Sequence, residues 1–359
     1  MSIKDILKRS YENTYLPLSR KCFSRRLLKK QVKENHENLA ELTQEETKEI
    51  RKFWNKYGLE DFSLDTHRIL YAKTGIRDPR FVSQNIFYNH LRLVLNNQPL
   101  ARVWSDKNYL DLFLGNVETV DNVIRVVSGR LLNQNFELVT WQKAQELMNQ
   151  YEQLVTKPSL MTEKGIDVEL IEKPYDLKKI IRSYGQNFCI QVPLEQHHFF
   201  NNFNESSINS MRINTILLNT EAYVVNSFVK IGEPGQFADN RGENRYLLGF
   251  DDMGVLKDYC VDSKLNIRYE IPSGFKFAGK QIPYVDRVYK IATEAHKKMA
   301  HFGLAYWDIV LQSNNQPVIL EANLRAPNTI FIQAATGPFF GKHTEELLEF
   351  YLSHRNQVN

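Results

Sequence analysis

Cysteine is scarce in this chain: only three of its 359 residues are cysteines. Cys22, Cys189 and Cys260 are scattered along the sequence and show no CxxC or Cys/His spacing. An odd number of isolated cysteines argues against a disulfide framework and against a structural zinc site. We therefore expect each thiol to be a small buried apolar group in a reducing compartment.

Long apolar runs are absent as well. No stretch approaches the roughly 18 apolar residues that a membrane span requires, and the N-terminus lacks the apolar core of a signal peptide. The hydrophobic content of 42% and the charged content of 25% are typical of a globular protein, and the length allows two or three lobes. These features predict a cytoplasmic protein.

The net charge of +4 is unevenly distributed. Residues 1–33 contain ten Lys or Arg and two Asp or Glu, a local charge of +8, so the remaining residues together carry −4. A basic segment of this kind can bind anionic lipid at the inner face of a membrane, and a solvated helix docked on its neighbour is the alternative. Nucleic acid is not an expected partner, because the chain has no zinc finger and no basic sheet interleaved with aromatic residues.

Hydrophobic periodicity predicts a mixed α+β protein. Residues 2–57 have apolar residues at helical spacing, and Thr43 with Glu46 is a candidate capping box. Alternating or compact apolar stretches predict strands, and the clearest of them are residues 123–127, 131–132, 188–192, 211–218, 222–231, 304–311 and 317–324. A helix is expected to start near Pro283 and to end at Gly303, directly before the last hairpin.

The last two predicted strands carry the most informative pattern. If Asn314 and Asn315 form the hairpin turn, Asp308 lies opposite Glu321. Tyr306 then lies opposite Asn323, and alternation places Asp308, Glu321 and Asn323 on one face. Like charges in direct opposition are destabilising, so a cation is expected between the two carboxylates.

Three oxygen donors without His or Cys favour Mg²⁺ or Mn²⁺ over zinc. Mg²⁺ is commonly held by one or two carboxylates together with substrate phosphates, which points to a nucleotide triphosphate. Lys157, at the end of a predicted strand and before a turn, is suited to reach a phosphate. An ordinary solvated hairpin with acids on its wet face is the alternative interpretation.

Several short elements, in this order and spacing, resemble the ATP-grasp superfamily and, within it, the sugar-transfer-associated ATP-grasp family. The resemblance covers roughly residues 65–350. The elements that carry it are Asp106-Lys107-Asn108, Thr156-Lys157-Pro158-Ser159, residues 191–197, residues 206–212, Val229-Lys230-Ile231-Gly232, Asp239-Asn240, residues 250–254, Ile282-Pro283, Trp307-Asp308 and Glu321-Ala322-Asn323.

The resemblance implies an ATP-grasp fold, in which two α+β lobes clamp ATP, with a helical N-terminal extension. It divides the chain into a basic helical extension, a preceding segment, a small lobe and a large lobe with the metal site. The corresponding ranges are 1–60, 61–105, 106–194 and 195–353. Possible partners of the basic residues 1–33 are then a membrane or a glycan-assembly complex.

The resemblance also implies roles for individual residues. Lys107 and Lys157 would lie near the α- and β-phosphates of ATP, and Gln191, Val192, Pro193 and Leu194 would meet the adenine through backbone hydrogen bonds. Asp308, Glu321 and Asn323 would hold Mg²⁺ or Mn²⁺ on the β- and γ-phosphates. Arg212 and Lys230 would neutralise charge on the γ-phosphate or an acyl phosphate.

Many ATP-grasp ligases have an arginine two residues before the metal-binding Asp, where this chain has Tyr306. The missing charge would come from Arg212 or Arg325. The implied activity is an ATP-dependent ligase that joins a carboxylate to an amine through an acyl phosphate, in tailoring a cell-envelope or capsular polysaccharide precursor. The alternatives are an ATP-dependent phosphotransferase on a sugar or polyol, and a non-catalytic nucleotide-binding scaffold of a glycan-assembly complex.

Overall fold

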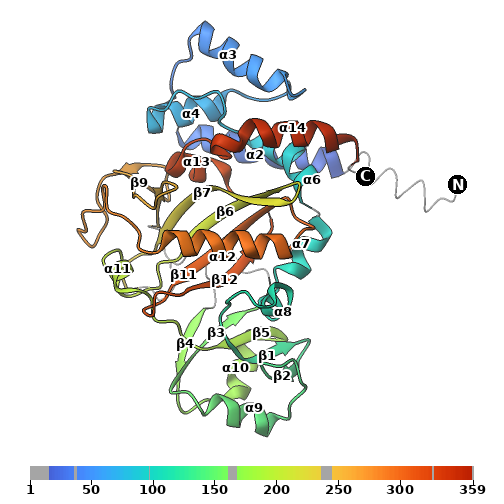
Figure 1. Ribbon diagram of the computed structural model, residues 1–359, viewed down its shortest axis with the longest axis vertical. Helices are drawn as coiled ribbons and strands as arrows, with labels where there is room; N and C mark the ends of the chain where they lie inside the picture. Colours follow the sequence, from blue (N-terminus) through green and yellow to red (C-terminus); the bar gives the residue numbers. More distant parts are fainter. Residues whose placement is uncertain are drawn as a thin grey trace, which may run out of the picture. The chain divides into compact units, whose positions relative to one another are not determined.

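The computed structural model describes residues 16–35, 39–96, 98–160, 168–235, 245–325 and 327–357. The start of the basic segment, residues 1–15, and the Asp239-Asn240 element lie outside the described residues. The expected α+β class with a helical N-terminal region is confirmed (Figure 1). None of the helices in the described ranges is both long and apolar enough to span a membrane.

The chain forms two compact units, and each is treated separately below. The first unit consists of Met1–Asn97, Leu265–Ile267 and Arg325–Asn359, and the second of Gln98–Lys264 and Arg268–Leu324.

The first unit is largely helical. Its helices are α2 (Leu16–Glu34), α3 (Gln44–Asn55), α4 (Asp65–Thr74), α5 (Gln84–Ile86), the π-helical turn η3 (Phe87–Leu91), α6 (Arg92–Leu95), α13 (Thr329–Thr336), η4 (Gly341–His343), α14 (Thr344–His354) and η5 (Arg355–Gln357). The capping box at the start of α3 is confirmed: Thr43 accepts a hydrogen bond from the Glu46 amide, and the Glu46 carboxylate accepts one from the Thr43 amide.

Helix α2 packs through one narrow face. Ser24, Leu28 and Gln31 recur at helical spacing and are buried. The Gln31 amide donates a hydrogen bond to Asn328 at 3.1 Å. The opposite face is exposed and includes Cys22, so the expectation that every cysteine is buried is wrong for this residue. Cys189 and Cys260 are buried as expected.

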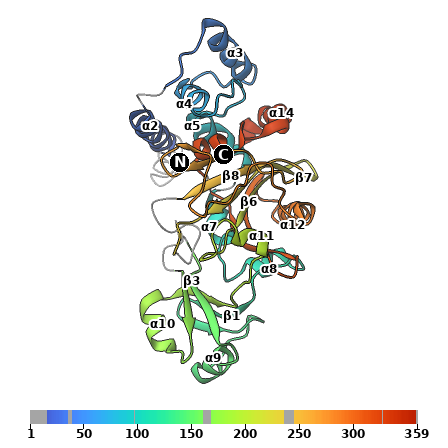
Figure 2. The same ribbon diagram turned by 90° about the vertical axis from the view of Figure 1, so that its left-hand side faces the viewer.

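The second unit contains two antiparallel sheets. The smaller sheet has the strand order β2-β1-β5-β3-β4, with β1 (Asn122–Val127), β2 (Arg130–Leu132), β3 (Gln153–Pro158), β4 (Glu169–Glu172) and β5 (Asn187–Gln191). Helices α9 (Trp141–Met148) and α10 (Leu177–Tyr184) lie beside this sheet (Figure 2). Their apolar residues Met148 and Ile180 share a core with Ile124 and Phe188 of the strands.

The larger sheet has seven strands in the order β10-β9-β8-β7-β6-β11-β12. They are β6 (Met211–Leu218), β7 (Glu221–Ile231), β8 (Tyr246–Phe250), β9 (Cys260–Asp262), β10 (Ile267–Arg268), β11 (Leu304–Leu311) and β12 (Pro317–Asn323). Helix α12 (Val285–Lys298) lies across one face (Figure 1) and contributes Val288 and Ala292 to the core. The helices α7 (Gln98–Trp104), α8 (Leu110–Leu114) and α11 (His198–Asn201) complete this unit.

The β11–β12 hairpin brings Asp308 opposite Glu321 and Tyr306 opposite Asn323, as predicted. The turn itself differs from the prediction. A turn of Asn314 and Asn315 alone would pair Leu311 with Val318, whereas Leu311 pairs with Pro317. Of the two asparagines, only Asn315 has a positive φ, of 66°. A bulge between Asp308 and Ile309 then shifts the register by one residue. Because of this shift, Asp308 still lies opposite Glu321, which is the pairing that the predicted two-residue turn would have given.

His296 of α12 is buried against β6 and β11. Its Nδ1 lies 2.7 Å from the Thr215 hydroxyl and its Nε2 lies 2.8 Å from the Phe302 carbonyl oxygen. The indole of Trp307 donates to the same hydroxyl at 2.8 Å. Burial lowers the pKa of His296 from 6.5 to about 4. The imidazole is therefore neutral in the folded protein at neutral pH.

This pKa predicts a loss of stability in mild acid. The unfolded chain binds a proton at His296 below about pH 6.5, whereas the folded chain does so only near pH 4, so stability falls as the pH falls through this window. Between pH 7 and pH 5 we expect His296 to reduce the free energy of unfolding by about 2 kcal/mol. Urea denaturation at pH 7 and at pH 5 measures this change in the free energy of unfolding. His296→Gln should lose correspondingly less stability between the two pH values. An equal loss would contradict the assignment of the low pKa to His296.

Candidate functional site

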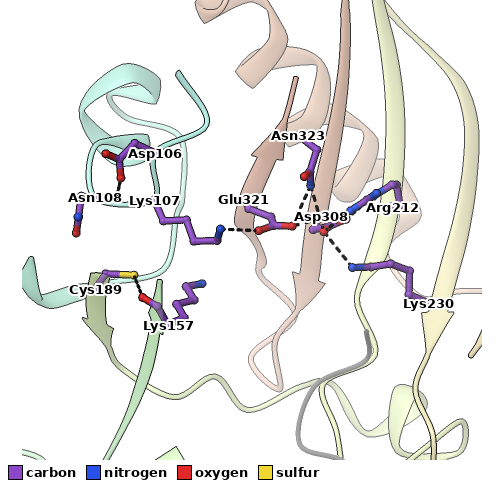
Figure 3. Close-up of polar contacts among 10 residues, drawn as sticks. All are labelled: Asp106, Lys107, Asn108, Lys157, Cys189, Arg212, Lys230, Asp308, Glu321 and Asn323. Carbon is purple, nitrogen blue, oxygen red and sulfur yellow. Dashed lines mark hydrogen bonds and ion pairs between the residues drawn. The ribbon is translucent and has the colours of Figure 1, made fainter. Parts of the chain in front are cut away.

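Two carboxylates on neighbouring strands form the centre of the site (Figure 3). Asp308 of β11 and Glu321 of β12 are cross-strand partners, and Asp308 is 1% exposed. Asn323, two residues after Glu321, points to the same face, and its amide nitrogen lies 2.9 Å from Glu321 Oε1 and 3.5 Å from Asp308 Oδ2. The three residues predicted to hold a metal therefore lie together.

Two cations from the neighbouring strands bind Asp308. Arg212 of β6 is its other cross-strand partner, and the guanidinium donates to both carboxylate oxygens at 2.7 and 2.6 Å. The Lys230 ammonium of β7 donates to Oδ2 at 3.0 Å. Arg212 also lies 4.0 Å from Glu321. Two predicted catalytic residues are thus in contact with a predicted metal ligand.

Two lysines approach from the side of the five-stranded sheet. The Lys107 ammonium lies 3.1 Å from Glu321 Oε2. Its backbone amide donates to the Ser159 carbonyl at 3.1 Å, which joins the Lys107 turn to the end of β3, where Lys157 lies. Lys157 faces Cys189 of β5 in register, and the Cys189 thiol is 3.6 Å from the Lys157 carbonyl oxygen.

Lys157 differs from the other three cations in having no carboxylate within ion-pair distance among the described residues. Burial lowers the pKa of Lys157, and the neighbouring Lys107 ammonium adds to this effect. Buried charges are costly unless they are paired. An anion bound beside Lys157 would relieve this cost.

The pKa values of the two central carboxylates depend on burial and on the cations beside them. Burial alone would raise the pKa of Glu321, but Lys107 and the surrounding donors hold it well below its usual range. Burial raises the pKa of Asp308, and Arg212 and Lys230 oppose that rise. Burial would also lower the pKa of Lys107, whereas Glu321 raises it above its ordinary value. The Lys107–Glu321 contact is therefore an ion pair.

The donor set fits a hard divalent cation. It consists of carboxylate and amide oxygens without nitrogen or sulfur ligands, which suits Mg²⁺ or Mn²⁺. The Asn323 amide group lies between the two carboxylates, so a flip of this terminal amide would turn its oxygen toward a cation at that point. No cluster of three or more His, Cys, Asp or Glu occurs in the described part of the chain. Phosphate oxygens or water molecules would therefore complete the coordination.

The predicted adenine-binding segment connects the two sheets of the second unit. Gln191 is the last residue of β5 and donates to Asn122 at 2.9 Å. The Val192 amide donates to Asp121 at 3.1 Å, and Pro193 has no N–H. The Val192 amide is therefore occupied, whereas the Leu194 amide and the carbonyl groups of residues 192–194 are candidates for pairing with an adenine edge.

Arg325 is exposed and belongs to the other unit, so it is not placed relative to this cluster.

A second row of side chains, which the sequence did not connect with the site, lies on the same face of the sheet. Tyr306 pairs with Asn323 and with Asn214, and Asn214 pairs with Asn226. The sequence contained one clue to this row: Asn214 lies two residues after Arg212, so both side chains point to the same face of the strand. The clue becomes informative only when the order of the strands is known.

Residues 181–346, a little under half of the chain, match the family model described as sugar-transfer associated ATP-grasp. This match confirms the resemblance predicted from the sequence for that region. No curated protein has a detectably similar sequence.

Solved structures of ATP-grasp ligases are similar in fold at low sequence identity. The D-alanine–D-alanine ligase from Bacillus anthracis is 15% identical, with a TM-score of 0.39 over 70% of this chain and 67% of that one. N5-carboxyaminoimidazole synthase from Aspergillus clavatus is 9% identical, with a TM-score of 0.41 over 69% and 56%. L-amino acid ligase from Bacillus licheniformis is 13% identical, with a TM-score of 0.40 over 84% and 58%. The matched region thus spans between about half and two thirds of these structures.

Replacement of the two lysines by methionine should have opposite effects on the ligand-free protein. Lys107→Met removes the cation that lies 3.1 Å from Glu321 and leaves the more distant Arg212 at 4.0 Å, so it should reduce the free energy of unfolding by about 3 kcal/mol. Lys157→Met removes a buried charge that has no acidic partner and should leave stability unchanged or raise it. Both variants should bind Mg-ATP at least tenfold more weakly. Urea denaturation and calorimetric titration measure these effects, and destabilisation by Lys157→Met would show that its charge is compensated.

Proposed function

Because residues 181–346 match the sugar-transfer associated ATP-grasp family, we propose that the chain is an ATP- and Mg²⁺-dependent carboxylate–amine ligase. Its substrate would be a cell-envelope or capsular polysaccharide precursor, in keeping with the description of the family. In this proposal residues 106–194 form the small lobe and residues 195–353 the large lobe of the ATP clamp. Residues 1–60 are the helical extension, and residues 61–105 precede the clamp.

One observation carries the proposal: four cations surround two carboxylates within a single, largely buried cluster. Lys107, Lys157, Arg212 and Lys230 face Asp308 and Glu321, so the six side chains have a net charge of +2. A fully ionised ATP with one bound Mg²⁺ carries −2. Mg-ATP therefore has the charge that neutralises the cluster, and water is largely excluded there, where electrostatic stabilisation is strongest.

The residues of the cluster would divide the work of ATP binding. Lys107 and Lys157 would lie against the α- and β-phosphates, and Asp308, Glu321 and Asn323 would hold Mg²⁺. The metal would supply neutralisation of the phosphate charge. Arg212 and Lys230 would turn from Asp308 toward the γ-phosphate once a metal occupies that carboxylate, and Arg325 is a further candidate for this charge.

The reaction needs positioning and charge stabilisation rather than a protein nucleophile. A substrate carboxylate oxygen attacks the γ-phosphorus, the bond to the β-phosphate oxygen breaks, and ADP leaves. An amine nitrogen then attacks the acyl carbon, the bond to the phosphate oxygen breaks, and phosphate leaves while the amine gives a proton to solvent. Arg212 and Lys230 are placed to stabilise the negative charge that develops in both steps.

The central test is the release of ADP and phosphate from ATP in the presence of carboxylate and amine pools. We expect both products to form in equal amounts and only when both pools are present. Asp308→Asn and Glu321→Gln should lower this rate at least a hundredfold and abolish stabilisation by Mg-ATP. Glu221→Gln, an exposed carboxylate on the same sheet, serves as the matched control.

Other outcomes would favour the alternative activities. ADP without free phosphate, together with a phosphorylated sugar or polyol, would identify a phosphotransferase. Stabilisation by Mg-ATP without any ADP formation would identify a nucleotide-binding scaffold. If Glu321→Gln binds Mg-ATP as tightly as the unchanged protein does, the assignment of the metal site is wrong.

We further propose that α2 docks on an anionic membrane surface. Its exposed face carries Arg25, Arg26, Lys29, Lys30 and Lys33. Near its N-terminal end, Leu18 and Phe23 are 57% and 54% exposed. Basic residues combined with exposed apolar side chains suit a surface of acidic lipids, and each basic residue contributes about 1 kcal/mol there.

Vesicle co-sedimentation tests this proposal. We expect the protein to bind vesicles of phosphatidylserine and phosphatidylcholine, and to bind pure phosphatidylcholine vesicles at least a hundredfold more weakly. Changing Arg25, Arg26, Lys29 and Lys30 to Gln should remove the difference without affecting Mg-ATP binding. The matched control changes four exposed lysines of the second unit, namely Lys276, Lys280, Lys290 and Lys298. Equal loss of vesicle binding in the control would overturn the assignment to α2.

A further inference from the structure

The second row of side chains, here called the polar row, consists of Asn323, Tyr306, Asn214 and Asn226. These residues are consecutive cross-strand partners on β12, β11, β6 and β7. On each of the four strands the polar row lies two residues from the row that contains Glu321, Asp308 and Arg212, so both rows point to one face. The separation along the strands is about 7 Å.

The polar row and the segment predicted to bind adenine lie at different positions along β11, with Asp308 between them. The segment predicted to bind adenine is joined to the far end of β11, because the His197 amide donates to the Leu311 carbonyl at 2.8 Å and Gln196 pairs with Gln312. Asp308 comes three residues before Leu311, and Tyr306 comes two residues earlier still. A nucleotide that extends from the adenine segment to Asp308 therefore has the polar row beyond its terminal phosphate.

The polar row differs from the charged row in chemistry. Its four side chains are neutral, and Asn214 and Tyr306 are 0% and 1% exposed. The Asn214 amide donates to Asn226 Oδ1 at 2.6 Å. The Asn214 Oδ1 atom is buried and accepts no hydrogen bond from the described residues. An unsatisfied buried oxygen of this kind is unfavourable, and a ligand donor would satisfy it.

This chemistry selects among carboxylate substrates. A carboxylate can only accept hydrogen bonds, so it cannot satisfy Asn214 Oδ1. The ammonium group of an amino acid would lie in a row that contains no carboxylate. Hydroxyl groups both donate and accept, and they match a row of amides and a phenol. The carboxylate of the substrate is better placed at Arg212 and Lys230, one row away.

We propose that the carboxylate substrate is a sugar acid of the uronic acid class, whose carboxylate faces Arg212 and Lys230 and whose ring hydroxyls bind Tyr306, Asn214 and Asn226 of the polar row. This inference rests on the proposed ligase function and names its substrate class. Asn214 and Tyr306 are in this view specificity-determining residues for the sugar ring.

Hydroxylamine, which converts an acyl phosphate to a stable hydroxamate with release of phosphate, allows the proposal to be tested without knowledge of the natural amine. The full-length protein is incubated with Mg-ATP, hydroxylamine and one of four acids, namely glucuronate, galacturonate, D-alanine or glutamate. We expect hydroxamate from at least one uronate and at least tenfold less from either amino acid.

Variants separate recognition of the sugar from chemistry. Asn214→Leu, which keeps the branching of the side chain, and Tyr306→Phe, which removes only the hydroxyl, should raise the KM for the uronate at least tenfold. The KM for ATP and stabilisation by a Mg-bound non-hydrolysable ATP analogue should not change. Asn219→Gly, at the positive-φ turn of the same β6–β7 hairpin, controls for effects on the hairpin. Tyr306→Phe decides the question if Asn214→Leu does not fold.

The outcomes distinguish this inference from the proposed function. Hydroxamate from the amino acids but from neither uronate would overturn the uronic acid assignment and leave the ligase proposal intact. Unchanged KM values for the uronate in both variants would remove the polar row from substrate recognition. No hydroxamate from any of the four acids, despite binding of the ATP analogue, would count against the ligase chemistry itself and the inference with it.

Discussion

The opposition of Asp308 and Glu321 across two adjacent strands is the constraint on which the rest of the site depends. Two directly opposed carboxylates, of which Asp308 is buried and Glu321 partly buried, are stable only when cations neutralise them. The protein supplies these cations from both sides, with Arg212 and Lys230 on Asp308 and Lys107 on Glu321. These cations come from two strands of the larger sheet and from the Lys107 turn, which is joined to the end of β3.

The same cluster is more than neutralised, because Lys157 adds a fourth cation that lacks a carboxylate partner in the described structure. A fold optimised for stability alone would not bury this charge. Its presence is explained if an anion of charge −2 completes the cluster, and stability without the ligand is then lower than the fold would allow. In the proposed function, the site thus holds in advance the positive charge that a bound nucleotide requires.

The sequence was sufficient to predict the α+β class, the hairpin and the pairing of Asp308 with Glu321. It did not predict the turn correctly. Between the turn and Ile309 the observed register differs from the predicted one by one residue, and a bulge beside Asp308 cancels this difference. Local alternation also could not reveal that Arg212 lies opposite Asp308, or that Asn214 lies opposite Tyr306, since strand order is a property of the whole sheet. The hydrogen bond from the Val192 amide to Asp121 could not be foreseen for the same reason, because Asp121 lies far away in the sequence.

The two rows on one face of the sheet suggest how recognition and chemistry are separated. Charged side chains attract any anion of suitable geometry, and an arginine at position 306 would extend that property along the strand. Tyr306, with Asn214 and Asn226 beside it, instead presents neutral donors and acceptors that a charged group cannot satisfy without losing its own hydration. A hydroxyl group loses less on leaving water and recovers it through paired hydrogen bonds. In the proposed ligase, neutrality in the second row therefore restricts which carboxylate can use the charge of the first.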